Sequence, residues 1–216
     1  MRIVLIGGGG HASDVLGAIE EVCRMDDTRR ITVAGILADE SIDDRRFRHR
    51  GVLQIGSVDE VKSVDATHYI VCVGFSKGRK AVFSRIHDCG LQPATIVHPN
   101  AYIPKGVPTG SGTVVLSGVS VSPMAEIGNH VYLSHGALIG HDCIIHDFVS
   151  VMPGASISGD TVLDDASLIG ANATVIQGIR VGKNATVGAG AVVVRDVEDD
   201  TTVVGNPAKV LAKRDA

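Results

Sequence analysis

Three histidines in the second half of the chain have the types and spacing needed for acid–base or metal chemistry. His135, His141 and His146 are six and five residues apart, and His141 is followed directly by Asp142. An imidazole accepts protons near neutral pH, and an adjacent carboxylate orients the ring and stabilises its charged form. The pair therefore indicates general base catalysis. A zinc site is an open alternative, because imidazole is a frequent zinc ligand.

A glycine-rich loop near the N-terminus is the second chemical signal. Gly7–Gly10 follow the apolar run Ile3–Ile6 and precede a helix whose apolar residues recur at Val15, Ile19 and Val22. Glycines at such a turn let backbone N–H groups approach a phosphate at the positive end of the helix. The region is only half of a two-lobed dinucleotide fold, so we expect a mononucleotide-sized pocket, unless the turn merely closes tightly. Its expected lining is Gly9, Gly10, His11, Asp39 and Gly74.

Two kinds of element must position these residues. The first is a six-residue repeat, which forms the later half of the chain. Starting at Val97, every sixth residue up to Val193 is aliphatic except Thr109, and a mostly small residue follows four places after each. A period of six is neither the period of a helix nor the alternation of a strand. The repeat therefore predicts a coil of short stacked strands.

The register of the repeat separates inward from outward side chains. Cys143 occupies the small inward position and is expected to be a buried thiol. His135 and His141 each lie two places after an inward aliphatic residue, so we expect them to point outward, one rung apart. His146 is expected at a corner. An outward His141 favours catalysis over a core histidine, with a solvated surface histidine as the open alternative.

Residues 1–95 alternate strands and helices instead. Ile31–Leu37 and Tyr69–Val73 are expected to be the second and third strands, and a second helix carries apolar residues from Val82 to Cys89 and ends at Gly90. The order predicts a small parallel Rossmann-like sheet with right-handed crossovers. The fold class is thus an α/β N-terminal domain followed by an all-β parallel β-helix.

Composition and charge narrow the class of protein. Of 216 residues, 44% are hydrophobic, only 3% are aromatic and 26 are glycine, which suits identical stacked rungs. A net charge of −4 indicates no nucleic-acid or membrane surface, and the arginines within Arg45–Arg50 are expected to form a solvated loop. The four cysteines form no CxxC pair, and no segment reads as a signal peptide or membrane span. We therefore expect a soluble cytoplasmic protein.

These motifs together resemble the sugar acyltransferases of the PglD/NeuD type. The resemblance rests on the hexapeptide register, on Gly140–Cys143, on the terminal Gly205–Lys209 and on the Gly-Gly-His-Ala stretch at Gly9–Ala12, and it covers essentially the whole chain. It implies a left-handed β-helix with three rungs per turn and a homotrimer with active sites between subunits. Residues 1–95 would bind the nucleotide sugar. Residues 96–216 would be the acetyltransferase domain with a C-terminal tail.

The resemblance also implies roles for individual residues. His141 matches the catalytic base, and Asp142 matches the acidic residue that raises its basicity. Ser150 stands where several relatives carry a histidine near acetyl-CoA, and its hydroxyl or backbone is expected to substitute. The residues implied to contact the nucleotide sugar are Gly9, Gly10, His11, Ala38, Asp39 and Gly74. Those implied to line the CoA groove are Ala171 and Ala189.

The implied activity is acetyl-CoA-dependent N-acetylation of a nucleotide-linked 4-amino-4,6-dideoxy sugar in lipopolysaccharide or glycan biosynthesis. GDP-perosamine is the favoured acceptor, because the members of the family that acetylate it are nearest in pattern, and a UDP-linked amino sugar comes next. No resident metal is expected. The alternatives are a sugar O-acetyltransferase of the sialic acid type, a zinc-dependent hydratase like the gamma carbonic anhydrases, and a nucleotide-sugar-binding scaffold with the coil as a trimerisation stalk.

Overall fold

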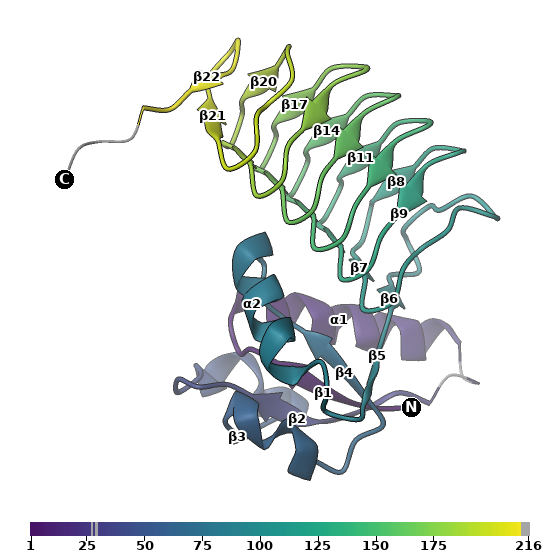
Figure 1. Cartoon of the computed structure of the whole chain (residues 1–216). Helices are drawn as coiled ribbons and strands as arrows, with labels where there is room; N and C mark the ends of the chain where they lie inside the picture. The colour runs from purple at the N-terminus through teal and green to yellow at the C-terminus, as the bar shows by residue number, and fades with distance from the viewer. Residues whose placement is uncertain (27, 29, 213–216) are drawn as a thin grey trace.

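A layer of sheet and helices leads into a long coil of short strands (Figure 1). The computed structural model describes residues 1–26, 28 and 30–212, so the end of the expected C-terminal tail lies outside the described residues. Within that described part, no helix combines the length and apolar character needed to cross a membrane.

The first layer is a parallel sheet with the strand order β3-β2-β1-β4-β5. Its strands are β1 (Arg2–Ile6), β2 (Thr32–Leu37), β3 (Gln54–Gly56), β4 (His68–Val71) and β5 (Gln92–Pro93). Every neighbouring pair runs parallel, as predicted. The sequence did not reveal β3 and β5, because strands of three and two residues are too short to show a pattern.

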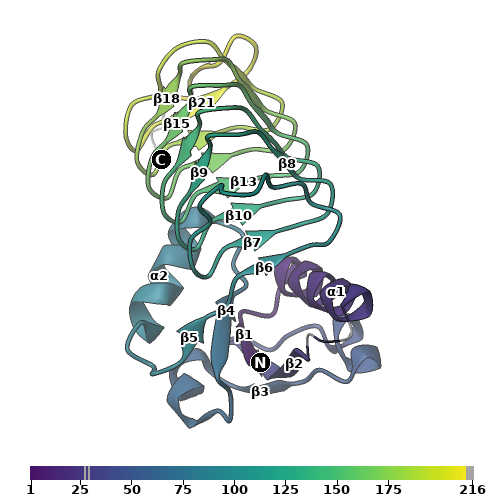
Figure 2. The same cartoon turned by 90° about the vertical axis from the view of Figure 1, so that its right-hand side faces the viewer.

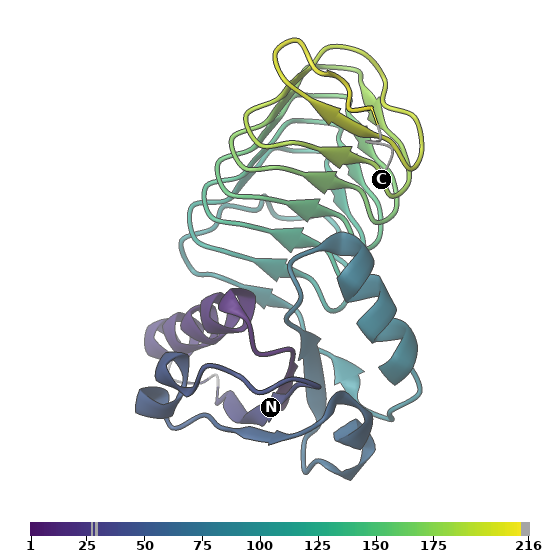
Figure 3. The ribbon, with the colours of Figure 1, turned by 90° about the vertical axis from the view of Figure 1, so that its left-hand side faces the viewer.

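Two helices cover opposite faces of this sheet (Figures 2 and 3). Side chains alternate along β1, so Ile3 and Leu5 pack with the helix α1 (Gly10–Met25), whereas Val4 and Ile6 pack on the side of α2 (Ser76–Ile86). The remaining helical turns are short: η1 (Asp44–Arg46), η2 (Arg48–Arg50) and η3 (Val58–Ser63).

The second helix is shorter than predicted. It ends at Ile86, and Cys89 lies in the following turn, where its N–H donates to the Ile86 carbonyl at 2.9 Å. Gly90 then takes a φ of 82°, a left-handed conformation that glycine adopts without strain. Gly90 therefore lies in the turn that follows the helix and is not the C-cap of the helix, which is His87.

The coil is built from two- and three-residue strands that stack in three parallel sheets. The first coil sheet has the order β22-β21-β19-β16-β13-β10-β7-β6, the second β20-β17-β14-β11-β8 and the third β18-β15-β12-β9. Tyr132 pairs with both Val114 and Ser150, eighteen residues away in each direction, so three strands make one turn. Only β22 runs antiparallel to its neighbour within the described residues.

The strands of the coil follow the six-residue period without interruption from β7 to β20. Their bounds are β6 (Ile96–Val97), β7 (Val114–Val115), β8 (Ser120–Val121), β9 (Glu126–Ile127), β10 (Tyr132–Leu133), β11 (Leu138–Ile139), β12 (Ile144–Ile145), β13 (Ser150–Val151), β14 (Ser156–Ile157), β15 (Val162–Leu163), β16 (Leu168–Ile169), β17 (Thr174–Val175), β18 (Arg180–Val181), β19 (Thr186–Val187), β20 (Val192–Val193), β21 (Thr202–Val204) and β22 (Lys209–Val210).

The inward positions predicted from the repeat form the core of the coil. From β7 to β20, the second residue of each strand and most of the small residues four places later pack into one apolar cluster, in which Cys143 and Val151 are fully buried. Cys143 is a free thiol, and burial raises its pKa, so it is held as an unreactive thiol inside the coil. The prediction of a buried Cys143 is confirmed.

One buried arginine joins α2 to the coil. Arg79 is 2% exposed, and its guanidinium donates five hydrogen bonds of 2.8–3.1 Å to carbonyl oxygens rather than to a carboxylate. Burial lowers its pKa to about 10, so the group remains charged at neutral pH. The carbonyls belong to Val73, Gly74, His130, Phe148 and Val149.

We expect Arg79→Met to lower the free energy of unfolding by at least about 3 kcal/mol, because it leaves buried carbonyls without donors. Arg85→Met on the same helix is the control, since Arg85 binds Asp39 and Asp59 at the surface and its loss should have a much smaller effect. Urea unfolding followed by circular dichroism measures both. Equal losses for the two variants would contradict a special role for Arg79.

Candidate active site

His141 and Asp142 form an exposed pair at the turn between β11 and β12. The ring Nδ1 lies 2.7 Å from a carboxylate oxygen of Asp142, and the two side chains are 59% and 49% exposed. Asp142 has a φ of 59°, in the left-handed region that aspartate tolerates better than most residues. The outward orientation predicted for His141 is confirmed.

The hydrogen bond fixes which ring nitrogen is free. An ionised carboxylate can only accept, so Nδ1 carries the proton in the neutral ring, and Nε2 keeps its lone pair. The ring lies over Gly159, where an added Cβ would come within 2.5 Å of the imidazole. Sequence reasoning missed Gly159, although its position eighteen residues after His141 in the repeat marks it as the neighbour in the next turn.

The glycine loop opens into a cavity of about 320 Å³ at the carboxyl ends of β1 and β2. An added Cβ on Gly9 would meet nothing within 4 Å, and Arg46 reaches the cavity from η1, beside Gly10. Gly9, Gly10 and Ala38 therefore lie together as predicted. The cavity residues that sequence reasoning missed are Gly8, Glu40, Ser41, Ile42, Asp43 and Arg46.

The arginine cluster is more than the solvated loop that was expected. Arg45 binds both carboxylate oxygens of Asp43 at 2.9 Å, which lowers the pKa of that carboxyl to about 2. Arg50 binds Glu20 of α1 and is only 16% exposed. Arg46 lines the cavity. Arg46 is exposed as expected, whereas the expectation was wrong for Arg50, because η2 folds back onto α1.

His11 and Gly74, which were expected in the lining, do not line this cavity and lie against the coil instead. The His11 ring is 4.4 Å from the Tyr132 ring, and an added Cβ on Gly74 would overlap it. Burial lowers the pKa of His11, which favours the neutral imidazole. Asp39 lies elsewhere, because Arg85 and the Val58 N–H bind its carboxylate.

The residues expected at acetyl-CoA occupy two different places. Ser150 is fully buried, and its hydroxyl donates to the Gly74 carbonyl at 2.7 Å, so it holds the first layer against the coil. Ala171 and Ala189 are at least partly exposed at successive turns between the first and second coil sheets. His141 lies at the corner between the second and third sheets, so one chain does not bring it together with these alanines.

The three histidines lie at three different corners of the coil. His135 follows the first coil sheet, His141 the second and His146 the third, and all are exposed. Across residues 1–26, 28 and 30–212, no three His, Cys, Asp or Glu side chains gather as a metal site would require. The zinc interpretation therefore finds no support in the geometry of a single chain.

Comparison with known proteins gives matches over part and over all of the chain. A family model described as the hexapeptide repeat of succinyl-transferase matches residues 162–195. The 2,3,4,5-tetrahydropyridine-2,6-dicarboxylate N-acetyltransferase of Staphylococcus aureus is 55% identical over 40 residues, 18% of this chain and 17% of that enzyme. The chain therefore spans less than a fifth of the length of such curated relatives.

Two solved structures match along almost the full length. The acetyltransferase domain of PglB from Neisseria gonorrhoeae, in complex with acetyl coenzyme A, is 30% identical, with 97% of this chain and 98% of that chain covered and a TM-score of 0.84. The H141N mutant of perosamine N-acetyltransferase from Caulobacter crescentus, in complex with CoA and GDP-perosamine, is 26% identical, with 99% and 98% covered and a TM-score of 0.87.

We expect the proton of the neutral His141 ring to reside on Nδ1, because Asp142 accepts a hydrogen bond from it. Long-range ¹H–¹⁵N correlation spectra of ¹⁵N-histidine-labelled protein report which nitrogen is protonated. Asp142→Asn should weaken this preference, since an amide also offers a donor to the ring. A wild-type ring protonated mainly on Nε2 would contradict the assignment.

Proposed function

The chain belongs to the PglD-type family of hexapeptide-repeat acetyltransferases, and we propose that it transfers the acetyl group of acetyl-CoA to the amine of a nucleotide-linked 4-amino-4,6-dideoxy sugar. The observation that carries the proposal is the exposed His141–Asp142 pair, with Nε2 free, on a hexapeptide coil. The complexes of the two relatives with acetyl coenzyme A and with CoA plus GDP-perosamine support the donor and favour GDP-perosamine as acceptor.

The reaction follows from the orientation of the ring. Nε2 of His141 accepts a proton from the sugar amine as its nitrogen attacks the thioester carbonyl. Asp142 orients the ring and stabilises the imidazolium that forms, and a backbone N–H of the coil stabilises the oxyanion. The C–S bond then breaks, and the imidazolium returns its proton to the departing CoA thiolate. Fixing both substrates in one groove supplies the proximity that the direct transfer needs.

The place of the pair in the coil supports a site shared between copies of the chain. The first layer packs on the first coil sheet through Val114 and Tyr132, whereas His141 occupies the corner opposite that sheet. We assign nucleotide-sugar binding to residues 1–95 of one copy and the base to the coil of another. The coil would be left-handed and the assembly a homotrimer, as in the family pattern.

Exposed apolar side chains around the pair favour the same assembly. Met124 is 75% exposed, Leu138 48% and Ile144 38%, and all three lie on the turns and strands that flank His141. Apolar side chains clustered beside a catalytic corner are typical of a surface that another chain or a ligand covers. CoA in a groove between neighbouring coils, against Ala171 and Ala189, would cover them.

We expect the wild type to release thiol from acetyl-CoA with at least one acceptor among GDP-, UDP- and dTDP-linked 4-amino sugars. His141→Asn should fold normally and lose about 100-fold or more in kcat, and Asp142→Asn about tenfold, because it acts through orientation. His87→Asn, at an exposed position after α2, is the matched control. Unchanged turnover in His141→Asn would refute the assignment of His141 as the base. Acetylation of hydroxy sugars alone would refute the proposal that the acceptor group is an amine.

We expect mixed assemblies of two inactive variants to regain activity. Gly10→Asp places a carboxylate where the phosphate would lie, and His141→Ala removes the base. Refolding the two together should restore roughly a quarter of wild-type turnover, because a shared site needs one intact loop and one intact base. No recovery, with mixed assemblies verified by mass spectrometry, would place the whole site within one chain.

A further inference from the structure

A second cavity lies on the same corner of the coil as the His141–Asp142 pair, one turn closer to the N-terminus. Its volume is about 340 Å³, within the range of roughly 300–1,000 Å³ seen for small-molecule pockets. Asp142 donates its N–H to the Pro123 carbonyl at 3.3 Å, and Pro123 belongs to the cavity wall. The upper wall of the cavity is therefore the turn next to the His141–Asp142 pair, although neither residue of the pair lines the cavity itself.

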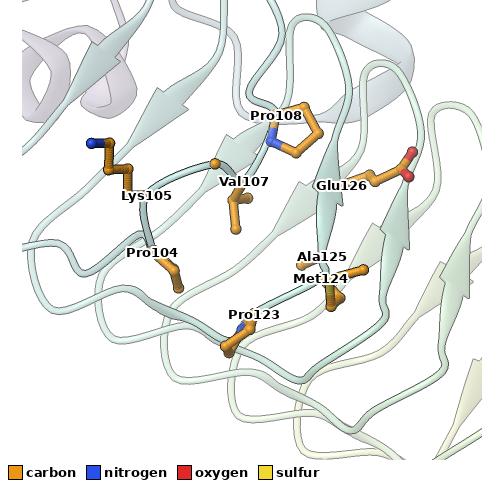
Figure 4. Close-up of a pocket in the computed structure, with 9 residues that line it drawn as sticks. Pro104, Lys105, Val107, Pro108, Pro123, Met124, Ala125 and Glu126 are labelled. Carbon is orange, nitrogen blue, oxygen red and sulfur yellow. The ribbon is translucent and has the colours of Figure 1, made fainter.

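We call this second cavity the lower cavity. Its lining is apolar in the middle and charged at the ends. Figure 4 shows Val107 pointing into the space beside Pro123 and Met124, with Lys105 and Glu126 at opposite ends. In the part of the chain that the structure describes, neither charged side chain makes an ion pair or a side-chain hydrogen bond. A free ammonium group thus stands at the edge of an apolar pocket near the base.

We infer that the lower cavity holds the sugar ring of the acceptor and that Lys105 binds the sugar-side phosphate of its diphosphate, with the nucleotide side at the glycine loop of another copy, an inference that rests on the proposed acetyl transfer. A pyranose has an apolar face, which fits the walls formed by Val107, Pro123 and Met124. The amine at C4 and the phosphate at C1 leave the ring from opposite sides. A ring in this cavity therefore presents its amine to the base while its phosphate meets the ammonium.

The position of Lys105 favours the nucleotide sugar over the CoA donor. In a nucleotide sugar the diphosphate is attached to the sugar itself, one ring width from the reacting amine. In acetyl-CoA the whole pantetheine arm separates the pyrophosphate from the reacting thioester. A cation two coil turns from His141, about 10 Å along the coil, lies within reach of the first diphosphate but not of the second.

Nothing in the sequence pattern singles out Lys105. It lies outside the glycine loop and outside the residues matched to the family, in the turn between Pro104 and Val107, whose N–H donates to the Pro104 carbonyl at 3.2 Å. Gly106 takes a φ of 95° in this turn, which only glycine adopts readily. The backbone thus holds the base of the Lys105 side chain at the cavity edge.

Steady-state kinetics of Lys105→Met test the inference, with Lys105→Arg as the charge-conserving variant. Lys183→Met is the matched control, because Lys183 is exposed at a different corner of the coil. With the acceptor that the wild type acetylates fastest, Lys105→Met should raise KM for the nucleotide sugar about tenfold. Its kcat and its KM for acetyl-CoA should stay close to wild type. Arginine should restore most of the affinity.

Calorimetric binding of GDP-perosamine separates this inference from the proposed function. Tight binding of GDP-perosamine by the wild type and weak binding by Lys105→Met, without thiol release by either, would support the sugar pocket and refute the proposed acetyl transfer. An unchanged KM for the nucleotide sugar in an active Lys105→Met would refute the sugar pocket and leave the proposed acetyl transfer supported. A raised KM for acetyl-CoA alone would assign the cavity to the acyl donor. A wild type that neither binds nor acetylates any acceptor would overturn both.

Discussion

The stacking of each coil residue on the residue eighteen positions later is the constraint on which the candidate site depends. Parallel pairing fixes this interval, as between Leu138 and Ser156, and so aligns equivalent residues in columns along the coil. One column holds His141 between the Pro123 turn and Gly159, and the missing side chain of Gly159 leaves room for the ring. The candidate base, the glycine that supports its ring and the lower cavity therefore take their relative positions from the register of the coil.

The junction between the first layer and the coil sets where the nucleotide cavity stands. Arg79 donates only to carbonyl oxygens, and Ser150 donates to the Gly74 carbonyl, so α2 and the end of β4 are held on the first coil sheet. This arrangement leaves the glycine-loop cavity on one side of the coil and the catalytic corner on another. The separation explains why the proposed site needs a second copy of the chain.

The coil and its outward histidine could be predicted from the sequence because every rung repeats the same environment. Deviations from a six-residue period would bury a polar side chain or expose an apolar one, so the pattern alone identifies His141 as exposed and Cys143 as buried. Tertiary contacts could not be predicted in this way. Nothing in the sequence distinguishes buried Arg79 from exposed Arg85 on the same helix, and Ser150 is buried only because the first layer covers it.

The central claim is that the base of one chain meets a substrate held by another. A crystal structure of His141→Asn with CoA and GDP-perosamine measures this most directly. We expect the diphosphate-linked nucleotide at Gly9 and Gly10 of one copy, with the sugar amine beside residue 141 of its neighbour and facing the CoA sulfur. A nucleotide bound away from the glycine loop, or an amine and a residue 141 from the same chain in contact, would contradict it.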